Sequence, residues 1–161
     1  MSDTSTGVLL LILAVLIASS AFFSSSETGM TSLNRYLLKH LSKKGLRDAR
    51  RTERMLERPD RLLGTILVGN NIVNILAASL ATVVAVRIWG DAGIAISTVA
   101  LTVVILIFGE ITPKTLAALR PEAIAFRVGQ PLAVLQRLLY PIVWLCNTLS
   151  NGLLRLLGVT M

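Results

Sequence analysis

The sequence is poor in charged residues and in the residues that build common metal and redox sites. Charged residues make up 16% of its 161 residues, whereas about 25% is usual in soluble domains. The single cysteine, Cys146, excludes an internal disulfide, and neither it nor the single histidine, His40, indicates a zinc site. We recognise no nucleophile–base pair, phosphate-binding glycine loop or redox cysteine pair, and we therefore do not expect an enzyme.

The sequence contains long apolar stretches without charged residues. Hydrophobic residues make up 53% of the chain, and the mean hydropathy is +0.71. Residues 4–26, 62–86 and 92–109 contain no charge, and roughly 20 apolar residues suffice to cross a bilayer. We expect an all-α integral membrane protein with spans at about 5–30, 62–86 and 93–119. Residues 18–21 of the first span resemble a signal-peptide cleavage site. The apolar run is longer than in a signal peptide, however, and no basic residue precedes it, so we interpret this span as a membrane anchor.

The positive charge is concentrated in one connection. Ten of the sixteen Lys and Arg residues lie within residues 35–61, between the first two spans. By the positive-inside rule this connection is cytoplasmic, which places the N-terminus outside and the C-terminus inside the plasma membrane. Although the pI near 10.5 is also typical of nucleic-acid-binding proteins, this distribution favours an orienting role, and we expect no nucleic-acid partner.

Two segments outside the spans have helical patterns. Residues 35–61 alternate acid and base at helical spacing, and Pro59 is expected to end this basic helix hairpin. Residues 121–158 carry spaced cations among apolar residues, with Pro131 and Pro141 interrupting them. We expect cytoplasmic juxtamembrane helices that lie along the interface rather than a fourth span. The apolar ending also leads us to expect that the chain is part of a longer protein.

The third span contains the sequence GEITPK, with Glu110, Pro113 and Lys114. A continuous helix over residues 92–119 would be about 42 Å long, which exceeds the roughly 30 Å hydrocarbon core, so we expect a break at Pro113. Proline has no N–H, which would free the Gly109 carbonyl beside the Glu110 carboxylate. Together they would suit a hard cation. The alternative is a structural ion pair between Glu110 and Lys114.

The first two spans also carry oxygen-bearing side chains. Ser20 and Ser24 share a helical face in SSAFFSSSETG, with Ser25 beside them, and Asn70 and Asn74 share a face in GNNIVN. Such residues often form interhelical hydrogen bonds only. Taken with Glu110, neutral oxygens around one carboxylate favour Mg²⁺, Ca²⁺, Mn²⁺ or Na⁺ over softer metals.

The ordered set FSSSETG, GNNIVN and GEITPK, on successive spans, resembles the transmembrane domain of the CNNM/CorC family of magnesium transporters. The resemblance covers nearly the whole chain, residues 1–161 as one domain. It implies a homodimer in the lipid bilayer that exports Mg²⁺ and is driven by Na⁺ entry. Family members also carry cytoplasmic CBS domains that bind ATP, which this chain does not include.

The resemblance also implies the ion ligands. They are Ser20, Ser24, Asn70, the Gly109 carbonyl and Glu110, with Ser25 and Asn74 as further candidates. Many eukaryotic members have Asn where Glu27 stands here, which leaves the charge balance of the site open. Alternating access would make the Pro113 break, next to Lys114, the candidate moving element. The remaining alternatives are a transporter of Mn²⁺ or Ca²⁺, and a membrane scaffold or sensor whose polar residues only hold helices together.

Overall fold

The computed structural model describes residues 3–159, and nearly all of them are helical. The order is α1 (Asp3–Thr31), α2 (Arg35–Lys43), α3 (Arg47–Leu56), α4 (Pro59–Trp89), the 3₁₀ turn η1 (Gly90–Ala92), α5 (Gly93–Val104), the π-helix η2 (Ile105–Ile111), α6 (Thr112–Leu119), α7 (Pro121–Leu138) and α8 (Tyr140–Leu156). No strand occurs within residues 3–159, which confirms the predicted all-α fold.

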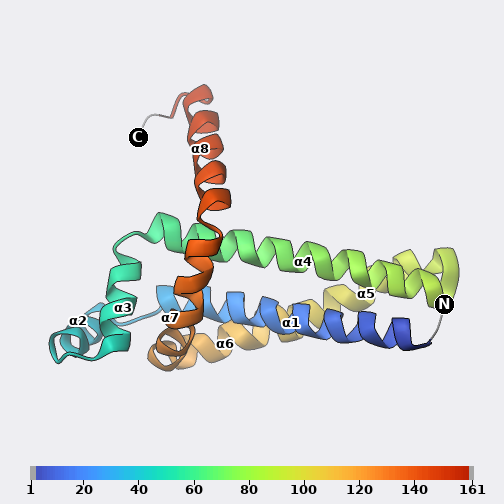
Figure 1. Cartoon of the computed structure of the whole chain (residues 1–161), viewed down its shortest axis with the longest axis horizontal. Helices are drawn as coiled ribbons and strands as arrows, with labels where there is room; N and C mark the ends of the chain where they lie inside the picture. The colour runs from blue at the N-terminus through green and yellow to red at the C-terminus, as the bar shows by residue number, and fades with distance from the viewer. Residues whose placement is uncertain (1–2, 160–161) are drawn as a thin grey trace.

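Two helical runs are long and apolar enough to cross a membrane, Ser5–Thr31 and Pro59–Leu119. The second has 61 residues, and as one straight helix it would measure about 92 Å, far more than a bilayer. It reverses direction at η1, where Gly90 has a φ of 68° that residues with a Cβ rarely adopt. As a result α4 and α5 contact each other, and the run forms two arms beside α1 (Figure 1).

The basic connection folds as two short helices at one end of these arms. Asn34 caps α2, because its Oδ1 accepts hydrogen bonds from the backbone N–H of Tyr36 at 3.0 Å and of Leu37 at 3.3 Å. Gly45, with a φ of 91°, makes the turn to α3. The helix α3 ends at Leu56, shortly before Pro59, as the sequence predicted, and Pro59 then begins α4.

The helix α1 lies at the centre of the packing, since it contacts α4, η2, α6 and α7. The largest buried side chains gather at the end of the bundle that carries α2 and α3, and they include Met30, Leu62, Ile66 and Leu132. Toward the opposite end, apolar side chains such as Leu11 and Val99 are exposed on the outer faces of the arms. Lipid tails would cover such surfaces in a bilayer.

Two further helices, α7 and α8, follow the third arm. Pro131 lies inside α7 without ending it, which corrects the expected interruption there. The axis instead bends by 70° between Leu138 and Tyr140. In Figure 1, α7 crosses the end of the bundle near α3, and α8 stands roughly perpendicular to α4. Taken together, α7 and α8 are apolar enough to form a broken span or a re-entrant pair, so their position along the membrane surface stays a prediction.

Candidate cation site between α1, α4 and η2

Polar side chains from α1 and α4 meet within the bundle. The Ser20 hydroxyl lies 3.4 Å from Asn70 Oδ1, and Asn74 Nδ2 lies 3.5 Å from the same oxygen. Ser20 is 1% exposed, and the two asparagines are half-buried. Both hydrogen bonds to Asn70 Oδ1 are long and therefore weak, so a stronger ligand could replace them. The face shared by Asn70 and Asn74 therefore turns toward α1.

Two buried oxygens in this region have no hydrogen-bond partner among the described residues. They are Ser24 Oγ and Asn74 Oδ1, and Ser24 is fully buried one helical turn after Ser20. Leaving a buried polar atom without a partner costs about 1–3 kcal/mol. Such atoms in a folded protein call for an explanation, and a bound ion or water is one of the usual ones.

The third arm approaches Ser20 through Gly109, which is buried. An added Cβ at Gly109 would lie 2.9 Å from the Ser20 hydroxyl oxygen, closer than real Cβ atoms come. A Cβ at this position would force the Ser20 hydroxyl to move, so glycine allows the backbone of η2 to approach α1 closely. The backbone of residue 109, and with it the carbonyl that the sequence singled out, lies beside the serine and asparagine cluster.

The predicted break at Pro113 needs a correction. The chain stays helical through Pro113, which lies in the first turn of α6, and the distortion comes before it as the π-helix η2. The Thr112 N–H donates to the Ile107 carbonyl, five residues back. The carbonyl of Phe108 therefore has no helical donor, because Thr112 is engaged elsewhere and Pro113 has no N–H. The Gly109 carbonyl likewise receives nothing from Pro113, so the proline frees backbone oxygen without breaking the helix.

Glu110 directly follows Gly109, but its carboxylate is bound within the same helix. Lys114 Nζ lies 3.1 Å from Glu110 Oε2, and the two side chains are 44% and 23% exposed respectively. This is the ion pair that the sequence left open as an alternative. Within residues 3–159 the structure shows no hydrogen bond from Glu110 to the serines or asparagines, so the carboxylate is adjacent to the cluster rather than part of it.

Ser25 lies outside this cluster. Its hydroxyl donates to the Phe22 carbonyl of its own helix at 3.0 Å, as does that of Ser26 at 2.6 Å. The structure thus brings together Ser20, Asn70, Asn74 and Gly109, places Ser24 one turn away, and leaves Ser25 aside. Sequence reasoning missed the Phe108 carbonyl, although a proline five residues later is a signal that could have revealed it.

Close packing of α1 against α4 also depends on a glycine. A Cβ at Gly69 would collide with the ring of Phe23, which is buried next to Ser24. Val143 of α8 similarly fills the space beside Gly64, since its side chain would lie 2.8 Å from a Cβ added there. These two glycines of α4 therefore allow close packing of helices within one chain.

The sequence comparisons agree with this arrangement. A family profile described as the cyclin M transmembrane N-terminal domain, CNNM, matches residues 11–161. The chain belongs to the CNNM family of transmembrane domains. The three oxygen-bearing segments on α1, α4 and η2 are therefore features of a CNNM domain, and the predicted membership is confirmed.

Several curated relatives are similar to this CNNM domain. The UPF0053 inner membrane protein YfjD of Escherichia coli strain K12 is 53% identical over 140 residues, which are 87% of this chain and 33% of that protein. A UPF0053 protein of Haemophilus influenzae is 44% identical over 161 residues, 100% of this chain and 38% of that protein. A polyamine export protein of Salmonella typhimurium is 28% identical over 172 residues, which are 93% of this chain and 36% of that protein. The chain spans about a third of the length of these relatives.

The site is thus a cluster of mostly neutral oxygens in a membrane-embedded domain. Residues 3–159 contain no group of three or more His, Cys, Asp or Glu side chains that could hold a metal. Any cation bound here would be held by hydroxyl, amide and carbonyl oxygens, with Glu110 as the nearby source of negative charge. Such oxygens suit hard cations.

Proposed function

We propose that this CNNM domain transports Mg²⁺ across the plasma membrane, with the ion bound between α1, α4 and η2. The observation that carries the proposal is the pair of buried oxygens without partners, Ser24 Oγ and Asn74 Oδ1. They flank the Ser20–Asn70 contact that Gly109 packs against. Each of these oxygens is one helical turn from that contact, on opposite sides of it because α1 and α4 run antiparallel (Figure 1). A cation at the contact could therefore bind one of them directly and offset the cost of burying it.

The proposed ligand set fits a hard divalent ion that binds weakly enough to be released. Mg²⁺ favours octahedral oxygen coordination and usually keeps several waters. Neutral oxygens from three helices could replace some of those waters. A single carboxylate, Glu110, would leave the site with net positive charge, which keeps binding weak enough for release.

Lys114 gives the site a second state. The ammonium of Lys114 lies 3.1 Å from Glu110 Oε2 and can neutralise the carboxylate in the absence of an ion. An arriving Mg²⁺ competes for the same carboxylate, and Lys114 must then move away. Because Lys114 is almost half-exposed, its flexible side chain has room to do so. The π-helix η2 is the candidate moving element, since its hydrogen-bond ladder is already irregular.

The finer parts of the proposal come from the family resemblance and the charge distribution. They are export of Mg²⁺, coupling to Na⁺ entry, a homodimer, and a topology with the N-terminus outside and the basic connection and C-terminus in the cytoplasm. Na⁺ prefers the same kind of oxygen ligand, so it could alternate with Mg²⁺ at one cluster. Mn²⁺ and Ca²⁺ are the competing cargo ions with similar ligand preference.

A second candidate cargo is a polyamine, because two relatives of this chain are named polyamine export proteins. The Glu110 carboxylate, or one of the unpartnered oxygens of Ser24 and Asn74, could accept a hydrogen bond from an ammonium group. A polyamine carries several such groups along an extended chain, and each needs its own acceptors. The cluster, with one carboxylate nearby, is better matched to a compact ion.

Transport by the purified chain in proteoliposomes tests the proposal. Wild-type protein should carry Mg²⁺ into vesicles containing a magnesium-sensitive dye, and Glu110→Gln and Asn70→Leu should lose most of that flux. Asn71→Leu is the matched control, because Asn71 is the exposed neighbour of Asn70 on α4. Full Mg²⁺ flux through Glu110→Gln would contradict the proposed role of the carboxylate.

Ligand-dependent stability separates the alternatives, because a ligand that binds only the folded state raises the unfolding temperature. Mg²⁺ should stabilise the purified chain more than Mn²⁺, Ca²⁺ or spermidine at equal concentration. Stabilisation by spermidine alone would favour polyamine cargo. If no cation has an effect while Asn70→Leu lowers the unfolding temperature, the polar residues only hold helices together, as in a scaffold or sensor.

A further inference from the structure

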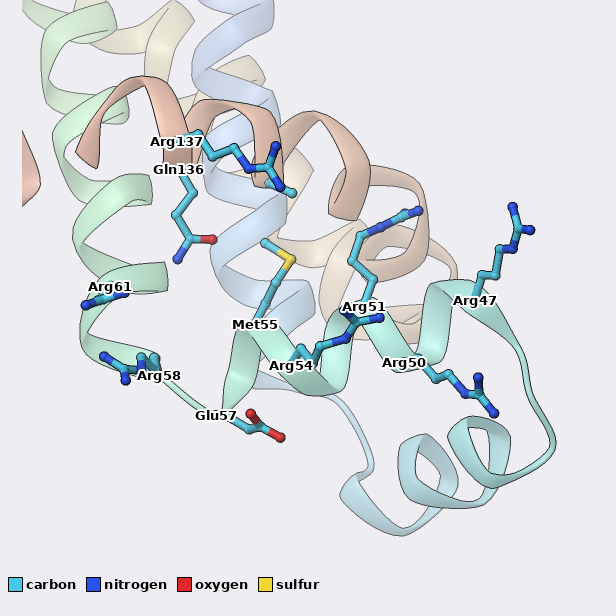
Figure 2. A pocket seen from close by; sticks show the side chains of 11 residues that line it. Arg47, Arg50, Arg51, Arg54, Met55, Glu57, Arg58, Arg61, Gln136 and Arg137 are labelled. Atoms are coloured by element: carbon cyan, nitrogen blue, oxygen red, sulfur yellow. The ribbon is translucent and has the colours of Figure 1, made fainter. Parts of the chain in front are cut away.

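An arginine-rich cavity lies at the end of the bundle that carries α2 and α3. It has a volume of about 780 Å³, and seven arginines line it (Figure 2). Four of them lie on α3, two flank the start of α4, and Arg137 comes from α7. Glu57 is the single acidic residue of the lining. The sequence pattern alone favoured a solvated hairpin with an orienting role, whereas the fold adds α7 and encloses a concave basic surface.

Most of this positive charge is uncompensated. Of the seven arginines, Arg51 alone forms an ion pair within the described residues, with Asp48 at 3.3 Å. Arg50 donates to the Ser42 carbonyl at 3.2 Å. Arginines gathered around one cavity repel each other, and a concave surface of one sign concentrates counter-ions. A multivalent anion would relieve the repulsion and bridge α3, α4 and α7.

Aromatic residues place the cavity at the level of the lipid headgroups. The Arg61 guanidinium lies 5.3 Å from the centre of the Tyr140 ring. A smaller adjoining cavity shares Arg58 and Arg61 with the first and is also lined by Tyr140 and Trp144. Tyrosine and tryptophan are enriched where a membrane meets water. The apolar stretch of α4 begins at Leu62, directly after Arg61, so the arginines lie at that boundary.

The same part of α7 also forms an apolar groove. Leu135 and Leu139 line a cavity of about 330 Å³ together with Phe22 of α1 and with Ile72 and Val73 of α4. Arg137 and Leu135 are two residues apart, so the arginine cavity and the apolar groove lie on opposite faces of α7. A phospholipid whose headgroup occupies the first cavity would have its acyl chains beside α7, whereas a soluble anion would leave that apolar surface uncovered.

We propose that the arginine cavity binds the headgroup of an anionic phospholipid from the adjacent leaflet, with its acyl chains alongside α7. Guanidinium groups bind phosphate oxygens in a bidentate manner, and arginine is the residue best suited to that contact. Basic pockets next to membrane helices are known to take such headgroups. The lipid ties the basic hairpin to α4 and α7. This site is independent of the cation site.

Lipid-dependent thermal unfolding of the purified chain in neutral detergent tests the proposal. Cardiolipin and phosphatidylglycerol should raise the unfolding temperature in a saturable manner, and phosphatidylcholine should not. The combined variant Arg54→Gln/Arg58→Gln/Arg137→Gln should need at least tenfold more cardiolipin for the same shift. Arg87→Gln, at the opposite end of α4, and Arg155→Gln, on α8 outside the cavity, should respond as the wild type does.

Three results would overturn the proposal. One is equal stabilisation by phosphatidylcholine, and another is an unchanged cardiolipin response in the combined variant. The third is equal stabilisation by millimolar inorganic phosphate or pyrophosphate, which would assign the cavity to a soluble phosphate instead. If the combined variant does not fold, as judged by circular dichroism, each single variant is titrated and should need about threefold more cardiolipin. Unchanged single variants would then refute the proposal.

Discussion

Lys114 is the residue whose replacement tests the cation site most sharply. Its ammonium lies 3.1 Å from the Glu110 carboxylate. If Mg²⁺ uses that carboxylate, binding must first break the pair. Lys114→Met removes the charge and keeps an apolar side chain of similar length. We therefore expect Lys114→Met to bind Mg²⁺ more tightly than the wild type, although the variant lacks a charged residue at the site.

The magnitude follows from the exposure of the pair. An exposed ion pair between residues four apart in a helix contributes about 0.3–0.5 kcal/mol. Because the two side chains are 44% and 23% exposed, solvent screens this ion pair only moderately less than it screens a fully exposed pair. We take about 0.5–1 kcal/mol as its contribution, and since 1.4 kcal/mol corresponds to a factor of ten, the Mg²⁺ Kd should fall about two- to fivefold. Release should slow by a similar factor.

Titration calorimetry of the purified chain at fixed ionic strength measures this change, because salt screens the pair. Lys114→Arg is the control, since it keeps the positive charge and should bind Mg²⁺ as the wild type does. When Glu110→Gln is also present, Lys114→Met should no longer change the Mg²⁺ Kd. An unchanged or weaker Mg²⁺ affinity in Lys114→Met would refute the competition between Lys114 and the ion, and with it the role of Glu110 as a ligand.

Two further predictions concern the buried face of α1. Ser24→Ala removes a buried hydroxyl that has no partner, so thermal unfolding without ions should show equal or greater stability, by up to about 1 kcal/mol, while the stabilisation by Mg²⁺ falls. Ser25→Ala, whose hydroxyl bonds within its own helix, should leave the Mg²⁺ response intact, and equal losses in both variants would contradict the assignment. Gly109→Ala would place a Cβ 2.9 Å from the Ser20 hydroxyl oxygen, so we expect a loss of roughly 1–3 kcal/mol in the free energy of unfolding and a weaker Mg²⁺ response. Adding Ser20→Gly should restore part of the stability but not the Mg²⁺ response, because it removes a proposed ligand. A fully stable Gly109→Ala variant would show that the close approach of η2 to α1 is unimportant.

Much of the site was predictable because helical periodicity places residues four apart on one face. Ser20 with Ser24, and Asn70 with Asn74, were identified in this way, and α1 does contact α4 along those faces. Periodicity alone does not determine, however, which of the consecutive serines turns its hydroxyl toward α4. Ser24 is buried without a partner whereas Ser25 bonds to its own helix, and that difference depends on the rotation of α1 against α4.

The course of the third arm was harder to predict. A proline removes one hydrogen-bond donor, and a kink at Pro113 is the simplest local response. The chain instead widens its helix over Ile105–Ile111 and remains helical through the proline. The contact of Gly109 with Ser20 comes from another helix, and such long-range packing is absent from local sequence rules.

The sequence by itself determined that this chain is a helical membrane protein with a basic connection, because the cost of burying charge in lipid is large and depends on composition alone. Only the tertiary structure decided which oxygens remain without partners, that Gly109 packs against Ser20, and that α7 joins α3 in lining an arginine cavity. These features arise where segments distant in sequence meet. Their energies depend on distances of a few ångströms, which the order of residues does not specify.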